Sequence, residues 1–161
     1  TKADGTKFGK SAEGAVWLDS AKTSPYKFYQ FWINCADEDV LRFLKIFTFL
    51  STADIAELAD AQQSQPGARL AHRRLAQEVT TLVHGESAVA AVERITAAIF
   101  SNRIDALTEQ DFAQLAQDGL PSTHFDLSEV GLLALLFESG LATTPKGEVT
   151  LGQAKKLILG N

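Results

Sequence analysis

The sequence predicts an all-α fold: a helical bundle with a loop-rich segment before it and a smaller, incomplete α/β unit behind it. Apolar residues recur at the 3.6-residue spacing of amphipathic helices along most of the chain. Capping residues and Gly or Pro breakers separate these stretches. Since 45% of the 161 residues are apolar, the chain can fill a core, as one ordinary domain or as a domain plus part of another.

The first helix has a clear start at Ser24-Pro25, an N-cap serine followed by proline at the first helical position. This helix runs to about Asn34 and carries five aromatic residues within seven positions. Aromatic side chains in an RNA-binding protein can stack on bases. Their spread around most of the helix favours burial, and we also expect Trp17 to pack against the body.

Four further helices are expected in the bundle. Asp37 is predicted to cap a helix from Glu38 to about Leu50, which is apolar around most of its circumference and therefore expected to be central. Ser51 or Thr52 caps the next, which ends at the breaker Pro66-Gly67. Two more follow over residues 68–83 and 86–101. The second of these is expected to turn its apolar residues inward: Val89, Val92, Ile95, Ile99 and Phe100.

A capping box at Thr108–Asp111 opens a short helix that ends at Gly119. Residues 121–127 contain a proline and are predicted to be a linker. Ser128 is then expected to cap a helix that ends at Gly140, and Thr150 to open the last helix, which stops at Gly160.

Composition and charge exclude several classes of protein. No apolar run reaches the roughly 18 residues of a membrane span. The net charge of −5 is uneven, because residues 1–30 hold five lysines and three acids while the remainder is acidic. A protein that coats RNA non-specifically would be basic throughout, so any RNA contact must be local. The single cysteine excludes an internal disulfide and fits a reducing compartment.

One stretch carries chemistry: Lys7-Phe8-Gly9-Lys10-Ser11. Two ammonium groups on either side of a glycine suit the binding of polyphosphate. A P-loop would need its first glycine at position 4, where Asp4 stands, and a helix directly after Ser11, which Ala-Glu-Gly does not favour. The P-loop is therefore the weaker interpretation.

The same five residues resemble the KMSKS loop of class I aminoacyl-tRNA synthetases, in the form found in bacterial tyrosyl-tRNA synthetases. Flanking segments resemble that family as well, continuously and in one order: Lys2–Lys7, Ala15–Asp19, Thr23–Asn34, Arg42–Phe49 and Leu82–Gly85. The chain has no methionine, so we expect residue 1 to be a cut end. The family's nucleotide-binding domain has no counterpart here. The chain therefore resembles the C-terminal part of such an enzyme.

The resemblance implies a tyrosine-tRNA ligase, which activates tyrosine with ATP, releases pyrophosphate and transfers the tyrosyl group to tRNA(Tyr). It implies that Lys7 and Lys10 are the catalytic cations, and that Gly9 and Ser11 join them in binding ATP. Mg²⁺ is expected to accompany ATP, with no tightly bound cofactor and no protein metal site. The implied parent is cytoplasmic and homodimeric, while this piece alone is expected to be monomeric.

The resemblance also divides the chain. Residues 1–24 are the KMSKS loop and the connection from the missing catalytic domain, and residues 25–120 are the anticodon-arm-binding domain. Residues 128–161 are the start of a truncated S4-like RNA-binding domain. In this last part Leu151 replaces a basic residue usual in the family, which leaves the pair Lys155 and Lys156 as its candidate tRNA contacts.

Three residues of the helical body are further candidates for tRNA binding. Arg69 and Arg73 lie one turn apart in a stretch, residues 61–77, that contains no acid. They could contact the phosphate backbone or form a solvated charged face. Asp37 offers a carboxylate that could read the N–H donors of an anticodon guanine, or could serve only as an N-cap. The alternative function, from another class, is a non-catalytic helical RNA-binding or protein-interaction module.

Overall fold

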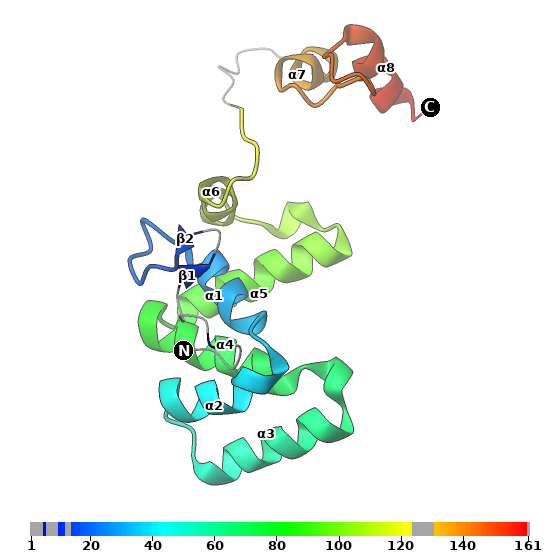
Figure 1. Cartoon of the computed structure of the whole chain (residues 1–161). Helices are drawn as coiled ribbons and strands as arrows, with labels where there is room; N and C mark the ends of the chain where they lie inside the picture. Colours follow the sequence, from blue (N-terminus) through cyan, green and yellow to red (C-terminus); the bar gives the residue numbers. More distant parts are fainter. Residues whose placement is uncertain (1–4, 6–9, 12–13, 124–130, 161) are drawn as a thin grey trace. The chain divides into compact units, whose positions relative to one another are not determined.

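The computed structural model describes residues 5, 10–11, 14–123 and 131–160, which fall into two units, Thr1–Gly119 and Leu120–Asn161. The first unit is a helical body preceded by a short hairpin, β1 (Lys10–Ser11) and β2 (Gly14–Ala15). The described part of the chain is overwhelmingly helical, which confirms the predicted fold class (Figure 1).

The helices of the first unit follow one another with short connections. Their bounds are α1 (Pro25–Ile33), α2 (Asp37–Phe47), α3 (Thr52–Ser64), η1 (Pro66–Ala68), α4 (Leu70–His84), α5 (Glu86–Ser101), η2 (Ile104–Ala106) and α6 (Glu109–Gln117). The predicted caps at Ser24 and Ser51 and the capping box at Thr108–Asp111 are all confirmed. Gly85, at a φ of +86°, joins α4 to α5 in a conformation that glycine tolerates best.

The helix at the centre of this unit is α4, which packs against α1, α2, α3 and α5. Figure 1 shows α1 crossing α4 and α5. Buried side chains from these helices form one core around Phe28, Trp32, Phe43, Leu44 and Leu75. Burial of the aromatic residues Phe28, Tyr29 and Trp32 of α1 agrees with the prediction that this helix is mainly core.

Three predictions about packing were wrong. The helix α2 is not central: it buries Val40, Phe43 and Leu44 on one side, while Ile46 is 61% exposed. Ala36, and not Asp37, occupies its N-cap position. Trp17 is 49% exposed, with the ammonium group of Lys22 4.5 Å from its ring centre.

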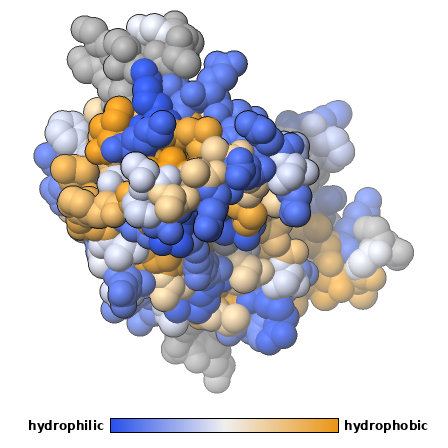
Figure 2. All heavy atoms as spheres, turned by 90° about the horizontal axis from the view of Figure 1, so that it is seen from below, coloured by the Kyte–Doolittle hydropathy of each residue, from blue (hydrophilic) through white to orange (hydrophobic). Residues whose placement is uncertain are grey.

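The inward face predicted for α5 was also partly wrong. Val92 and Ile95 are buried as expected, but Ile99 is half exposed and Phe100 is 87% exposed. Both lie in the last turn of the helix. Hydrophobic residues also reach the surface elsewhere: on the face in Figure 2 they form patches separated by hydrophilic residues.

The second unit contains α7 (Leu132–Glu138) and α8 (Leu151–Leu159), which pack against each other. An isolated antiparallel bridge pairs Thr143 with Val149 between them. Thr150 caps α8 by accepting a hydrogen bond from the backbone N–H of Gln153, as the sequence predicted. The predicted cap at Ser128 lies outside the described residues.

Candidate functional site

The phosphate loop predicted from sequence ends in the β1–β2 hairpin. Lys10 pairs with Ala15 and Ser11 with Gly14 in antiparallel register. Lys7 and Gly9 lie outside the described residues, so the structure does not test their roles. In this hairpin β1 holds the last two residues of the predicted loop, Lys10 and Ser11, and β2 leads on toward the helical body.

The segment that follows the hairpin is held to the body by α6, about ninety residues further along the chain. The Ser24 hydroxyl donates a 2.5 Å hydrogen bond to the Asp118 carboxylate, and the Gln117 side-chain amide donates to the Ser20 carbonyl at 2.8 Å. Within the segment, the backbone N–H of Trp17 donates to the Thr23 hydroxyl at 3.0 Å. These bonds fix the chain between the hairpin and α1.

Asp37 is part of a polar cluster at the junction of α1, α2 and α4. Its Oδ1 lies 3.0 Å from His72 Nε2 and 3.7 Å from Arg69 Nη1. The Asp37 side chain is 69% exposed, whereas His72 is only 2% exposed. The structure thus brings together two residues predicted separately, Asp37 and Arg69, and leaves the carboxylate accessible from solvent.

His72 belongs to this cluster, although no role was predicted for it. Burial lowers the pKa of His72, and the nearby Arg69 lowers it further, while Asp37 acts in the opposite direction. The imidazole is therefore held mainly in its neutral form near pH 7. His72 Nε2 lies 3.0 Å from the Asp37 carboxylate but makes no hydrogen bond to it, so the two groups form a close polar contact.

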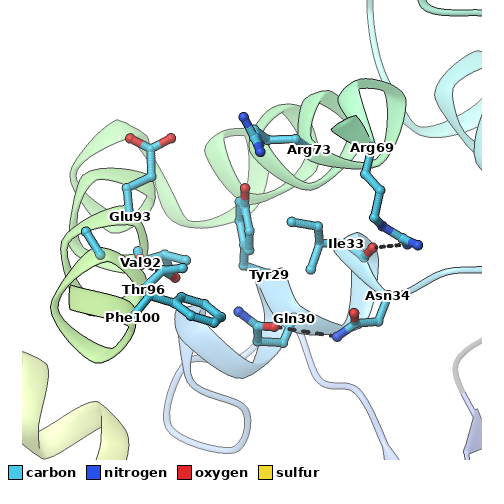
Figure 3. Close-up of a pocket in the computed structure, with 11 residues that line it drawn as sticks. Tyr29, Gln30, Ile33, Asn34, Arg69, Arg73, Val92, Glu93, Thr96 and Phe100 are labelled. Atoms are coloured by element: carbon cyan, nitrogen blue, oxygen red, sulfur yellow. Dashed lines mark hydrogen bonds between the residues drawn. The ribbon is translucent and has the colours of Figure 1, made fainter. Parts of the chain in front are cut away.

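Arg69 has a structural role that the sequence did not reveal. Its backbone adopts the left-handed conformation, with φ of +47°, between η1 and α4. Its Nη2 donates to the carbonyl oxygen of Ile33 at 2.9 Å, at the C-terminal end of α1 (Figure 3). A cation is favourable at a helix C-terminus, where carbonyl groups lack partners. Arg69 therefore links α4 to α1 while remaining about half exposed.

Arg73 lies one turn further along α4 and is exposed. It forms no hydrogen bond or ion pair with any described residue, unlike its neighbour Arg74, which pairs with Glu78 at 2.8 Å. Arg69 and Arg73 both line a surface pocket formed by α1, α4 and α5 (Figure 3). The structure therefore brings the two arginines together at one concave site.

The other predicted residues lie elsewhere in the chain. Lys155 and Lys156 are exposed on α8 of the second unit. Within the ranges that the structure describes, no three His, Cys, Asp or Glu side chains gather as a potential metal site. In those same ranges, none of the helices has both the length and the apolarity needed to cross a membrane.

Similarity to known proteins agrees with these features. The family model described as tRNA synthetases class I (W and Y) matches residues 1–101. A tyrosine–tRNA ligase from Chromobacterium violaceum is 54% identical over 142 residues, which cover 88% of this chain and 34% of the relative. One from Sodalis glossinidius is 53% identical over 165 residues, covering 100% of this chain and 36% of the relative.

Among solved structures, a C-terminally truncated mitochondrial tyrosyl-tRNA synthetase from Aspergillus nidulans matches with a TM-score of 0.51 and 36% identity. That match covers 53% of this chain and 25% of the other. The chain spans about a third of the length of the curated relatives that it matches. Since the family model covers more than half of its residues, the chain belongs to the class I tRNA synthetases of the W and Y group.

Proposed function

We propose that the chain is the C-terminal part of a tyrosine-tRNA ligase, which activates tyrosine with ATP and transfers it to tRNA(Tyr). The observation that carries this proposal is the identity of 53% to a tyrosine–tRNA ligase across the whole chain. The family model covers both tryptophan and tyrosine enzymes, so it does not by itself indicate which amino acid the ligase activates. The sequence identity to named tyrosine–tRNA ligases supports tyrosine as that amino acid.

In this proposal residues 1–24 supply the phosphate loop. Negative charge grows on the β- and γ-phosphates of ATP as tyrosine attacks the α-phosphate and pyrophosphate leaves. The cations of Lys7 and Lys10 stabilise that charge in the transition state more than in the ground state. Gly9 permits the loop to close over the nucleotide, and Ser11 donates a hydrogen bond. Mg²⁺ would arrive bound to the phosphates of ATP.

Residues 25–120 form the anticodon-arm-binding domain in this proposal. Asp37 is the candidate reader of an anticodon guanine, because its carboxylate is exposed and lies beside the cation of Arg69. Arg69 and Arg73 supply positive charge for the phosphate backbone. The exposure of Asp37 and its position outside the N-cap support a role beyond helix capping.

Residues 128–161 are the start of an S4-like RNA-binding domain, with 121–127 as the linker before it. Lys155 and Lys156 on α8 are its proposed tRNA contacts. The parent enzyme is proposed to be a cytoplasmic homodimer joined through its catalytic domain, and this piece by itself a monomer.

The test of the overall function uses the full-length protein. With tyrosine it should catalyse ATP–pyrophosphate exchange and charge tRNA(Tyr), while tryptophan and phenylalanine should support neither reaction at comparable rates. Exchange that depends on tryptophan would place the protein in the other branch of the family. Tight tRNA binding without any exchange would support the non-catalytic RNA-binding module instead.

The role of Asp37 is tested by Asp37→Asn, which keeps the size of the side chain but removes the acceptor pair that guanine needs. The variant should bind tRNA(Tyr) less tightly and discriminate less against anticodons that lack the first guanine. A loss of about tenfold corresponds to one charged hydrogen bond. If affinity and anticodon preference both stay at wild-type values, Asp37 is not the reader.

A further inference from the structure

The C-terminal end of α6 presents a row of polar side chains to the segment that follows the β1–β2 hairpin. Gln114, Gln117 and the C-cap residue Asp118 are three and four positions apart, so they lie on one face. Each makes one hydrogen bond to residues 20–26, and the partners are the Tyr26 N–H at 3.3 Å, the Ser20 carbonyl at 2.8 Å and the Ser24 hydroxyl at 2.5 Å. These bonds span 88 to 97 positions, so this face of α6 is directed at one distant segment.

The other end of α6 is fixed to α5. The guanidinium of Arg94 donates two 2.8 Å hydrogen bonds to the carboxylate of Asp111, whose side chain is only 1% exposed. The same carboxylate accepts from the Thr108 backbone N–H in the capping box that opens the helix. Two-bond pairs between arginine and a carboxylate fix orientation as well as distance. The helix α6 is therefore a rigid support with one end on α5 and the other on residues 20–26.

The segment between the hairpin and α1 is itself tightly folded. The Thr23 hydroxyl accepts from the Trp17 N–H at 3.0 Å, and the Thr23 N–H donates to the Asp19 carbonyl at 3.1 Å. Thr23 and Ser24 are both buried, and Val16 packs against the core. The segment begins directly after Ala15, the residue of β2 that pairs with Lys10 of β1. A support that holds this segment consequently holds the hairpin that carries Lys10.

Helix formation and burial do not account for these contacts. Ser24 already caps α1 by accepting from the Lys27 N–H at 3.0 Å, and this capping bond needs no carboxylate. Gln117 is exposed, and a hydrogen bond at the surface contributes little net stability because water can replace it. What the contacts from Gln117 and Asp118 do add is a fixed position for the segment relative to α6 (Figure 1).

We propose that Asp118 and Gln117 are positioning residues for the activation of tyrosine by ATP. By holding residues 20–24, they fix β2 and thereby the strand that carries Lys10 toward the phosphates. The inference rests on the proposed function, in which Lys10 stabilises the departing pyrophosphate. A displacement of about 1 Å in a catalytic group can cost about a hundredfold in rate, so a distant support of this kind affects the reaction without touching ATP.

The experiment measures tyrosyl-adenylate formation by the full-length protein, in single turnovers at saturating tyrosine and ATP. Asp118→Ala removes the acceptor for the Ser24 hydroxyl, while Asp118→Asn removes the charge and keeps an oxygen that can accept. Gln117→Ala removes the bond to Ser20, and Gln110→Ala is its matched control, an exposed glutamine of the same helix. Asp118→Ala is also made in a Lys10→Ala background.

We expect Asp118→Ala to lower the rate about tenfold and Gln117→Ala about threefold, both smaller than the loss from a full 1 Å displacement. Asp118→Asn and Gln110→Ala should stay within about twofold of wild type. The KM for tyrosine should not change, because Lys10 acts on the phosphates in the transition state. In the Lys10→Ala background, Asp118→Ala should change the remaining rate less than twofold, since the group that it positions is already gone.

The last comparison separates positioning from a general structural effect. A residue that only stabilises the fold would lower the rate by the same factor whether or not Lys10 is present, and that result overturns the proposal. A wild-type rate in Asp118→Ala overturns it as well, and so does an Asp118→Asn variant as slow as Asp118→Ala. A wild-type rate in Lys10→Ala alone would instead contradict the proposed function, so the two failures are distinguishable.

Discussion

The two units of the chain differ in how they are stabilised. The first buries a continuous set of large side chains around α4, among them Phe28, Leu44 and Leu75. In the described part of the second unit only Ala142 and Ala154 are buried, and its large apolar residues are partly or mostly exposed. Hydrophobic stabilisation scales with the apolar area removed from water, so most of it resides in the first unit.

This difference bears on function. A packed core holds side chains at fixed positions, as the Asp37–His72 contact and the pocket beside Arg73 require. Lys155 and Lys156 lie on a helix with little buried surface of its own. We therefore expect the first unit to provide geometric recognition of tRNA, and the second to contribute mainly charge.

The largest effect is expected at the centre of the first unit. Leu75→Ala removes a fully buried side chain from α4 and should lower the free energy of unfolding by about 2–5 kcal/mol. Both tryptophans and both tyrosines lie in the first unit, so their fluorescence follows its unfolding in urea. A loss below about 1 kcal/mol would contradict the central position of α4.

A smaller effect is expected at Asp111, a buried carboxylate that accepts two 2.8 Å hydrogen bonds from Arg94. Those bonds lower its pKa to about 2, against the opposing effect of burial and with help from Thr108. Asp111→Asn should therefore destabilise the first unit by about 1–3 kcal/mol at pH 7. Asp105→Asn, at an exposed pair with Arg103, should cost less than about 0.5 kcal/mol.

The pH dependence of Asp111 sharpens this prediction. Because its pKa is lower in the folded than in the unfolded chain, its contribution is complete above about pH 4 and is lost as the pH falls toward 2. The difference in stability between wild type and Asp111→Asn, measured by urea unfolding, should shrink over this range. A difference that stays constant from pH 7 to pH 2.5 would show that the carboxylate charge is not what stabilises α6.

Local rules predicted much of the fold. The Ser24-Pro25 start and the Thr108–Asp111 box follow from contacts within one helical turn, which a sequence displays directly. Periodicity identified α5 as amphipathic but placed Phe100 inward, because it cannot show where the neighbouring helices stop covering a face. Similarly, the bond from Arg69 to Ile33 spans 36 positions and depends on how α1 and α4 pack.

For the candidate site, the individual residues were predictable from the sequence but their arrangement was not. The KMSKS-like motif could be read from contiguous residues, and so could the individual residues Asp37, Arg69 and Arg73. Their grouping could not, since it arises from the junction of three helices.

The smallest effect is expected in the second unit. Leu157→Ala on α8 removes a half-exposed side chain and should cost less than about 1 kcal/mol. The tryptophan-detected unfolding midpoint should not move, while amide hydrogen exchange in α8 should become faster. A shift of that midpoint by the amount expected for Leu75→Ala would show that the two units share one cooperative transition.

The most direct test of the account concerns the proposed action of the loop on ATP. In the full-length protein, Lys10→Ala should lower the rate of tyrosyl-adenylate formation by about a hundredfold or more, at saturating tyrosine and ATP, without changing the unfolding midpoint. Lys22→Ala, an exposed lysine of the same segment that lies against Trp17, should leave the rate unchanged. A wild-type rate in the Lys10 variant would contradict the central claim that this loop stabilises the departing pyrophosphate.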